Sequence, residues 1–78
     1  MGREVILPGF SERIKSLRKE NNLKQKDMAD ILECTESHYQ KIEYGQINLP
    51  VLDVITLANH FGVSVDYLLG FSDRRKRR

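Results

Sequence analysis

Residues that stop helices divide this 78-residue chain into short segments, and the positions of these residues limit what the chain can fold into. The breaks fall at Pro8 and Gly9, at "ENN" near residue 22, at Glu33 and Cys34, and at Gly45, Gly62 and Gly70. Between them, apolar residues recur at the spacing of amphipathic helices. Helices this short are marginal in isolation, so each must be stabilised by packing against the others. The pattern predicts an all-α domain of five short helices.

The first two helices are expected over residues 11–22 and 25–32. Ser11 is a suitable N-cap for the first helix. Glu12 would stabilise the first turn of this helix, because a helix N-terminus carries partial positive charge. One face of each helix is apolar, formed by Phe10, Ile14 and Leu17 in the first and by Met28, Ala29 and Leu32 in the second.

The third helix is expected over residues 36–43, with Thr35 as its N-cap. Tyr39 and Ile42 are spaced to face inward. Gly45 is expected to end the helix in the left-handed conformation, which glycine adopts without a Cβ clash.

The fourth helix is expected over residues 51–61, because Pro50 suits a first turn and apolar residues follow at helical spacing. These apolar residues are Leu52, Ile55, Ala58 and Phe61. Ser64 is a suitable cap for a last short helix with Asp66 in its first turn. This helix is expected to carry Val65, Leu68 and Leu69 into the core.

The same signals set the domain limits. Residues 1–9 are expected to form an extended N-terminal arm, residues 10–71 the folded domain, and residues 72–78 a basic tail or linker, disordered on its own. The basic run "RRKRR" reads equally well as a phosphate-binding tail and as the start of a linker to a further domain.

Length and composition exclude several classes of protein. A single small domain with one cysteine, Cys34, has no internal disulfide and suits a reducing compartment, so a cytoplasmic location is expected. No apolar run is long enough to span a membrane. No metal site, cofactor or small-molecule substrate is expected, because the two histidines lack companion ligands and no catalytic pair or phosphate loop appears. The chain is therefore expected to be a binding protein and not an enzyme.

The net charge alone does not indicate nucleic-acid binding. Thirteen basic and eleven acidic residues give +2, but removing the five basic residues of "RRKRR" leaves eight against eleven, or −3. Between Lys24 and Tyr44 the sequence contains three lysines and five carboxylates. DNA binding would therefore require basic residues that cluster in space.

Three segments in a fixed order carry a more specific signal. "IKSLRKENNLKQKDMADIL", "IEYGQ" and "LANHFGVSVDYLLG" resemble the helix-turn-helix domain of the phage-repressor (Cro/C1, or XRE) family over about residues 11–70. The resemblance implies an all-α, five-helix repressor-like domain whose second and third helices form the helix-turn-helix, with the third lying in the major groove of DNA.

The resemblance also implies roles for particular residues. The positions expected to contact base edges are Glu36, Ser37, Gln40 and Lys41, and those expected to contact the DNA backbone are Lys24, Gln25, Lys26, His38, Gln46 and Asn48. Glu36 is interpreted as a base discriminator, since a carboxylate accepts a hydrogen bond from the cytosine amino group. Glu43 matches a position that is mostly structural, bonding near the loop after the third helix.

Three positions depart from the family pattern. Glu33 stands where the family usually has glycine and is expected to adopt positive φ. Lys24 replaces a Ser or Thr cap, losing a capping oxygen but gaining a charge that attracts phosphate. The family's proline after the third helix is displaced by one residue, with Leu49 in its place and Pro50 next.

Taken together, these features favour a bacterial or phage transcriptional regulator that binds double-stranded DNA as a homodimer and represses transcription. The alternative is a protein-interaction or antitoxin-like module with the same fold and no direct base readout. A positive rim around the third helix would favour DNA. The residues proposed for this rim are Lys24, Lys26 and Lys41, with Arg13 or Arg18 as further candidates.

Overall fold

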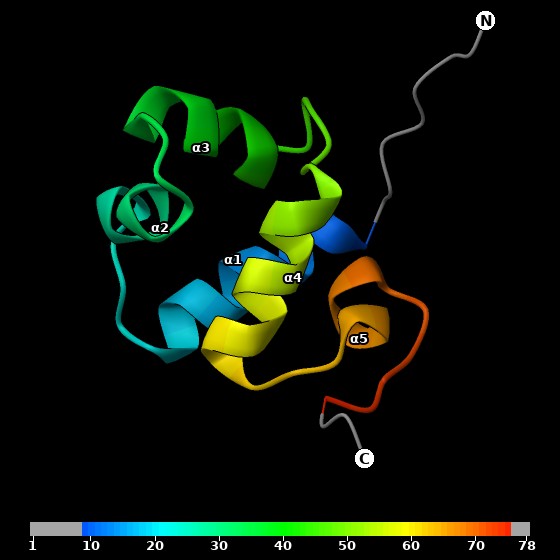
Figure 1. Ribbon diagram of the computed structural model, residues 1–78. Helices are drawn as coiled ribbons and strands as arrows, with labels where there is room; N and C mark the ends of the chain where they lie inside the picture. The colour runs from blue at the N-terminus through cyan, green and yellow to red at the C-terminus, as the bar shows by residue number, and fades with distance from the viewer. Residues whose placement is uncertain (1–8, 76–78) are drawn as a thin grey trace, which may run out of the picture.

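The computed structural model describes residues 9–75, which form five α-helices and no strand (Figure 1). The helices are α1 (Phe10–Glu20), α2 (Gln25–Leu32), α3 (Glu36–Glu43), α4 (Val51–Phe61) and α5 (Val65–Leu69). The predicted all-α, five-helix fold is confirmed. The arm expected over residues 1–9 lies almost wholly outside the described residues, as do residues 76–78. No helix in residues 9–75 is long and apolar enough to cross a membrane.

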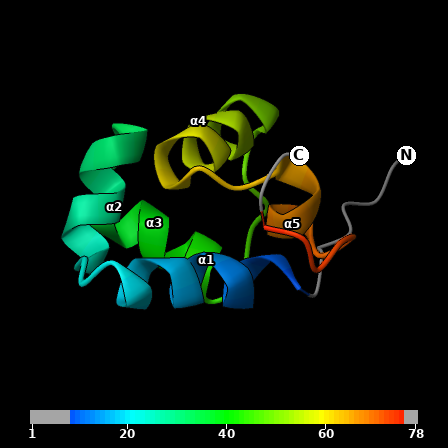
Figure 2. The same cartoon turned by 90° about the horizontal axis from the view of Figure 1, so that it is seen from below.

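One apolar core joins all five helices. Its fully buried side chains come from every helix: Ile14, Met28, Tyr39, Ile42, Leu57 and Leu68. Figure 2 shows α1 along one side of the molecule and α4 on the opposite side, with α2 and α5 at opposite ends. The helix-turn-helix of α2 and α3 is therefore held by packing against the other helices, which short helices need.

The capping predictions were correct at two helices and wrong at one. The Oγ1 of Thr35 accepts from the His38 N–H at 3.0 Å, and the Oγ of Ser64 accepts from the Tyr67 N–H at 2.9 Å. Ser11 does not cap α1, because the helix already begins at Phe10, with Gly9 at the N-cap position and no side-chain cap. Phe10 is buried in the core, and the N-cap lies two residues before the predicted Ser11.

Two apolar faces also differ from the predicted ones. In α4, Leu52 and Ile55 are 76% and 43% exposed, whereas Val54, Leu57 and Ala58 are buried. The helix carries apolar residues around most of its circumference, so their spacing alone does not choose the buried face. In α5, Val65 is exposed and Leu69 is partly buried, whereas Tyr67 and Leu68 enter the core.

Residues 72–75 pack against the domain, so the expectation of a disordered tail is wrong for them. Arg75 binds the Glu20 carboxylate with Nη1 and Nη2 at 2.9 and 2.6 Å. Arg13 donates to the Ser72 carbonyl at 2.9 Å, and its guanidinium lies 4.1 Å from the centre of the Tyr67 ring. This segment lies on the opposite side of the molecule from α3 (Figures 1 and 2).

The turn between α2 and α3 has the predicted left-handed residue. Glu33 has φ 58° and ψ 46°, and the Cys34 N–H closes the turn onto the Ala29 carbonyl at 3.0 Å. This backbone is strained for any residue that carries a Cβ atom. The strain predicts a gain in stability on removing the side chain.

We expect Glu33→Gly to raise the free energy of unfolding by up to about 1 kcal/mol. Equilibrium urea denaturation measures this difference. Glu33→Ala is the matched control, because it removes the carboxylate but keeps the Cβ. If the glycine variant is no more stable than the alanine variant, the left-handed strain is not the cause.

Candidate nucleic-acid interface

The outward side of α3 is polar along its whole length. Tyr39, Ile42 and Glu43 face inward and are buried. The outward positions are Glu36, Ser37, His38 and Lys41, all exposed, and Gln40, which is half-buried. The residues predicted to contact bases therefore lie on the side of the helix that a groove of DNA could meet. Whether they contact bases remains a prediction.

Gln25, the first residue of α2, connects the two helices of the motif. Its Oε1 accepts from the Gln40 amide at 3.0 Å, and its own amide donates to Glu43 Oε1 at 2.9 Å. The Tyr44 hydroxyl lies 3.4 Å from the same amide. The start of α2 is thus fixed relative to the outward side of α3, which positions Gln40 before any ligand is bound.

Glu43 is the centre of a buried network. Arg18 donates to its two oxygens from Nε at 2.7 Å and from Nη2 at 3.0 Å, and the Tyr39 hydroxyl donates at 2.6 Å. Burial by itself would raise the pKa of Glu43, but the hydrogen bonds from Arg18, Tyr39 and Gln25 outweigh it and hold the pKa below its usual range. The structural role predicted for Glu43 fits this geometry, but its partners lie on α1, α2 and α3 and not near the following loop.

Neither Arg13 nor Arg18, the two arginines proposed for the positive rim around α3, presents an unpaired charge at its surface. Arg18 is paired with the buried Glu43, and its side chain is only 13% exposed. Arg13 binds the Tyr67 and Ser72 carbonyls and the Asp73 carboxylate near α5. Both side chains are held by partners within the domain, so the rim must come from other residues.

Two lysines of α1 supply the missing positive charge. Lys15 and Lys19 are exposed and line an open groove together with Lys24, next to Gln25. The other groove residues are Arg18, Leu23, Glu36, Glu43 and Tyr44. Since Arg18 and Glu43 neutralise each other, three lysines face one exposed carboxylate, Glu36. Sequence reasoning missed Lys15 and Lys19, although their spacing of four residues places them on one side of α1.

Several carboxylates of the motif are engaged within the domain. Asp27 accepts from the Lys24 backbone N–H at 2.8 Å, which replaces part of the missing cap of α2. Asp30 lies 3.5 Å from Lys26 on the exposed surface. The excess of acidic residues counted along the sequence therefore does not describe the charge that the groove presents.

The remaining predicted positions lie in the loop after α3. Gln46 is exposed, and its N–H bonds the Lys41 carbonyl at 2.9 Å. Asn48 is partly buried and lines a separate apolar groove between α4 and α5. In residues 9–75, no group of three or more His, Cys, Asp or Glu side chains could hold a metal ion.

Comparison with known proteins agrees with this geometry. The sequence model of a family described as a helix-turn-helix domain matches residues 11–70, which is most of the chain and includes all five helices except Phe10, the first residue of α1. The chain belongs to this helix-turn-helix family. The resemblance to the phage-repressor type that the three segments indicated is thereby confirmed.

Curated relatives of this helix-turn-helix protein come from Bacillus subtilis (strain 168). It is 40% identical over 60 residues to the uncharacterized HTH-type transcriptional regulator YqaE, covering 77% of this chain and 52% of YqaE. It is 38% identical over 60 residues to the SPbeta prophage-derived uncharacterized HTH-type transcriptional regulator YonR, covering 77% of this chain and 56% of YonR. The chain thus spans little more than half the length of these relatives.

Proposed function

We propose that this helix-turn-helix protein binds double-stranded DNA in a sequence-specific way, as a homodimer, and represses transcription by occupying an operator. The observation that carries the proposal is that a polar helix face and a lysine-lined groove lie next to each other. The outward side of α3 carries hydrogen-bonding groups suited to base edges, and it adjoins a groove where Lys15, Lys19 and Lys24 collect positive charge. The names of the relatives, as transcriptional regulators, support the same conclusion.

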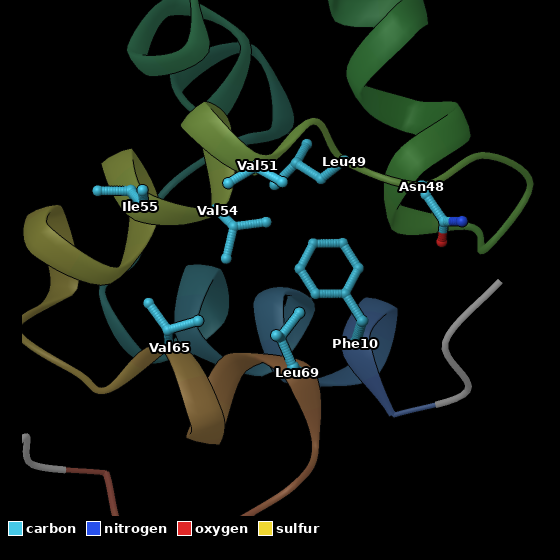
Figure 3. Close-up of a pocket in the computed structure, with 8 residues that line it drawn as sticks. All are labelled: Phe10, Asn48, Leu49, Val51, Val54, Ile55, Val65 and Leu69. Carbon is cyan, nitrogen blue, oxygen red and sulfur yellow. The ribbon is translucent and has the colours of Figure 1, made fainter. Parts of the chain in front are cut away.

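In this proposal the two surfaces have different tasks. Glu36, Ser37, Gln40 and Lys41 contact base edges in the major groove, with Glu36 selecting cytosine. Lys24, Gln25, Lys26, His38 and Gln46 contact the backbone, joined by Lys15 and Lys19. The α2 N-terminus adds free N–H groups that attract phosphate. Asn48 is also predicted to contact the DNA backbone. It lines the apolar groove between α4 and α5 (Figure 3), so it would lie at the edge of the DNA-contacting surface.

Selection of bound sequences from random duplex DNA tests the proposal directly. A two-fold symmetric site is expected, with half-sites separated by roughly 34 Å, or one turn of the duplex. Recovery of no preferred sequence, together with capture of a specific protein partner by the exposed side of α3, would favour the antitoxin-like alternative. The lysine-lined groove argues against that alternative because it provides the positive rim that DNA binding requires.

The lysines of the groove predict a dependence of affinity on salt. Each of Lys15→Ala, Lys19→Ala and Lys24→Ala should weaken binding to all duplexes alike and flatten the log–log salt slope by about 0.9 for each phosphate that the variant no longer neutralises. Fluorescence anisotropy across a salt series measures this slope. Arg74→Ala is the control, because Arg74 is exposed and belongs to the segment 72–75, on the opposite side of the molecule from α3 (Figure 1). An unchanged slope in all three variants would remove the groove from the interface.

A further inference from the structure

Residues 72–75, hereafter the strap, place an arginine on the last carboxylate of α1. Arg75 binds the two oxygens of Glu20 with Nη1 and Nη2 at 2.9 and 2.6 Å. Its Nε donates to the Tyr67 hydroxyl at 3.1 Å, and its guanidinium lies 5.3 Å from the centre of that ring. Two residues of different helices therefore hold this guanidinium in one orientation.

Main-chain hydrogen bonds hold the strap itself against the domain. The Ser64 N–H donates to the Arg75 carbonyl, and the Ser64 hydroxyl donates to the Arg74 carbonyl at 3.0 Å. From α1, Arg13 donates to the Ser72 carbonyl at 2.9 Å. The fold thus positions Arg75 beside the carboxylate, so this pair depends less on the ordering of two long side chains than an isolated surface ion pair does.

The position of Glu20 makes its charge matter to the groove where Lys15, Lys19 and Lys24 gather. Glu20 directly follows Lys19, so the two Cα atoms are about 3.8 Å apart. At physiological salt, charges more than about 8 Å apart are largely screened from each other, whereas closer ones are not. An unpaired carboxylate at Glu20 would therefore repel the phosphates that Lys19 is proposed to hold.

The charges of α1 lead to the same expectation. Both arginines of the helix are paired with carboxylates, as described above, which leaves Glu12 and Glu20 against Lys15 and Lys19. These four charges cancel. Once Arg75 neutralises Glu20, the helix has a net positive charge to present to an anion.

We propose that Arg75 strengthens anion binding at the lysine-lined groove without touching the anion, by neutralising Glu20 beside it. The inference rests on the proposed function for the identity of the anion, which is the DNA backbone. The strap lies on the opposite side of the molecule from α3 (Figures 1 and 2), so Arg75 is away from the surface proposed to meet DNA. Part of the basic run "RRKRR" thereby acts on a carboxylate of its own domain.

The protonation of Glu20 fits this role. Hydrogen bonds from Arg75 hold the pKa of Glu20 below its usual range, so the carboxylate is ionised at neutral pH. An exposed glutamate without a partner titrates at about 4.3 and is also ionised at neutral pH. Loss of Arg75 would therefore uncover a full negative charge and not a neutral acid.

The test is a double-mutant cycle in the 78-residue chain with Arg75→Gln, Glu20→Gln and the two substitutions together. Fluorescence anisotropy measures the affinity of each for the selected duplex at low salt, after thermal melting has established that each is folded. Arg75→Gln should weaken binding by about two- to fivefold, the effect of one added charge near the phosphates. In the Glu20→Gln background, the same substitution should leave the affinity unchanged.

Arg74→Gln is the matched control, because it removes the same charge from the same strap. The Arg74 side chain is exposed, and within the part of the chain that the structure describes only its main-chain groups are bonded. It should therefore weaken binding less than Arg75→Gln does. Equal losses from the two variants, no loss from Arg75→Gln, or a loss that persists in the Glu20→Gln background would each overturn the proposal.

Elution from heparin, a polyanion without base sequence, repeats the cycle without DNA. Arg75→Gln should elute at lower salt than the parent, and Glu20→Gln should abolish that difference. If the parent binds no duplex but this coupling is found on heparin, the proposed function fails and the role of Arg75 stands. If the parent binds its duplex and the cycle shows no coupling, the role of Arg75 fails and the proposed function stands.

Discussion

Arg18→Met is expected to lower the free energy of unfolding by about 3–5 kcal/mol, because it leaves the buried Glu43 carboxylate without its cation. The Glu43 side chain is completely buried, and Arg18 supplies two of its hydrogen bonds, at 2.7 and 3.0 Å. A domain of this size has a total stability of roughly 5–15 kcal/mol, so the loss is a large share of it. Equilibrium denaturation at neutral pH measures the change.

The double variant Arg18→Met with Glu43→Met is the control for this experiment. It removes both charges and should be more stable than the single variant, although the Tyr39 hydroxyl then loses its acceptor. If the double variant is less stable than Arg18→Met, the cost does not come from an unpaired buried carboxylate.

The same network predicts how stability depends on pH. In the folded protein the pKa of Glu43 lies below its ordinary value, so the ionised carboxylate stabilises the fold. This stabilisation is complete above the pKa that Glu43 has in the unfolded chain, and it is lost as the pH falls through the pKa in the folded protein. In Arg18→Met, burial without the guanidinium should raise the pKa of Glu43 instead. The stability gap between parent and variant should therefore narrow on acidification. A gap that widens would contradict this assignment.

Ile42→Asp is expected to unfold the domain. Ile42 is 0% exposed at the centre of the core, and a lone carboxylate there would have neither water nor a cation to satisfy it. Ile42→Val, the matched control, keeps the site apolar and should cost only about 0.5–1.5 kcal/mol. Circular dichroism during heating distinguishes the two. A cooperative melt of the aspartate variant near the parent temperature would mean that Ile42 is not buried.

Local signals predicted most of the fold. Thr35, Ser64 and Gly45 act on neighbouring backbone groups, so their effects can be read from a few residues of sequence, and the left-handed Glu33 followed from the turn that the family pattern implies. The Ser11 cap failed because burial of Phe10 outweighed a local preference. A local signal is reliable only where the core does not oppose it.

The features that local signals did not reveal depend on how the helices pack against one another. Arg18 and Glu43 are 25 residues apart, and nothing in either segment shows that they meet. Lys15 and Lys19 are near Lys24 in the sequence, but the direction that the chain takes between α1 and α2 decides that all three line one groove. The buried side of α4 is likewise chosen by its neighbours. The electrostatic character of the candidate interface could therefore not be obtained by counting charges along the helix-turn-helix.

The measurement that tests the central claim most directly is the affinity of the parent, Lys41→Ala and Lys24→Ala for the selected duplex and for a scrambled one. Lys41 lies on the outward side of α3, where we propose base contact, and Lys24 lies at the phosphate groove. Lys41→Ala should cost about 1–3 kcal/mol on the selected duplex and much less on the scrambled one. Lys24→Ala should weaken both duplexes similarly. Equal weakening of both duplexes by Lys41→Ala, or no binding by the parent at any salt concentration, would contradict base recognition by α3.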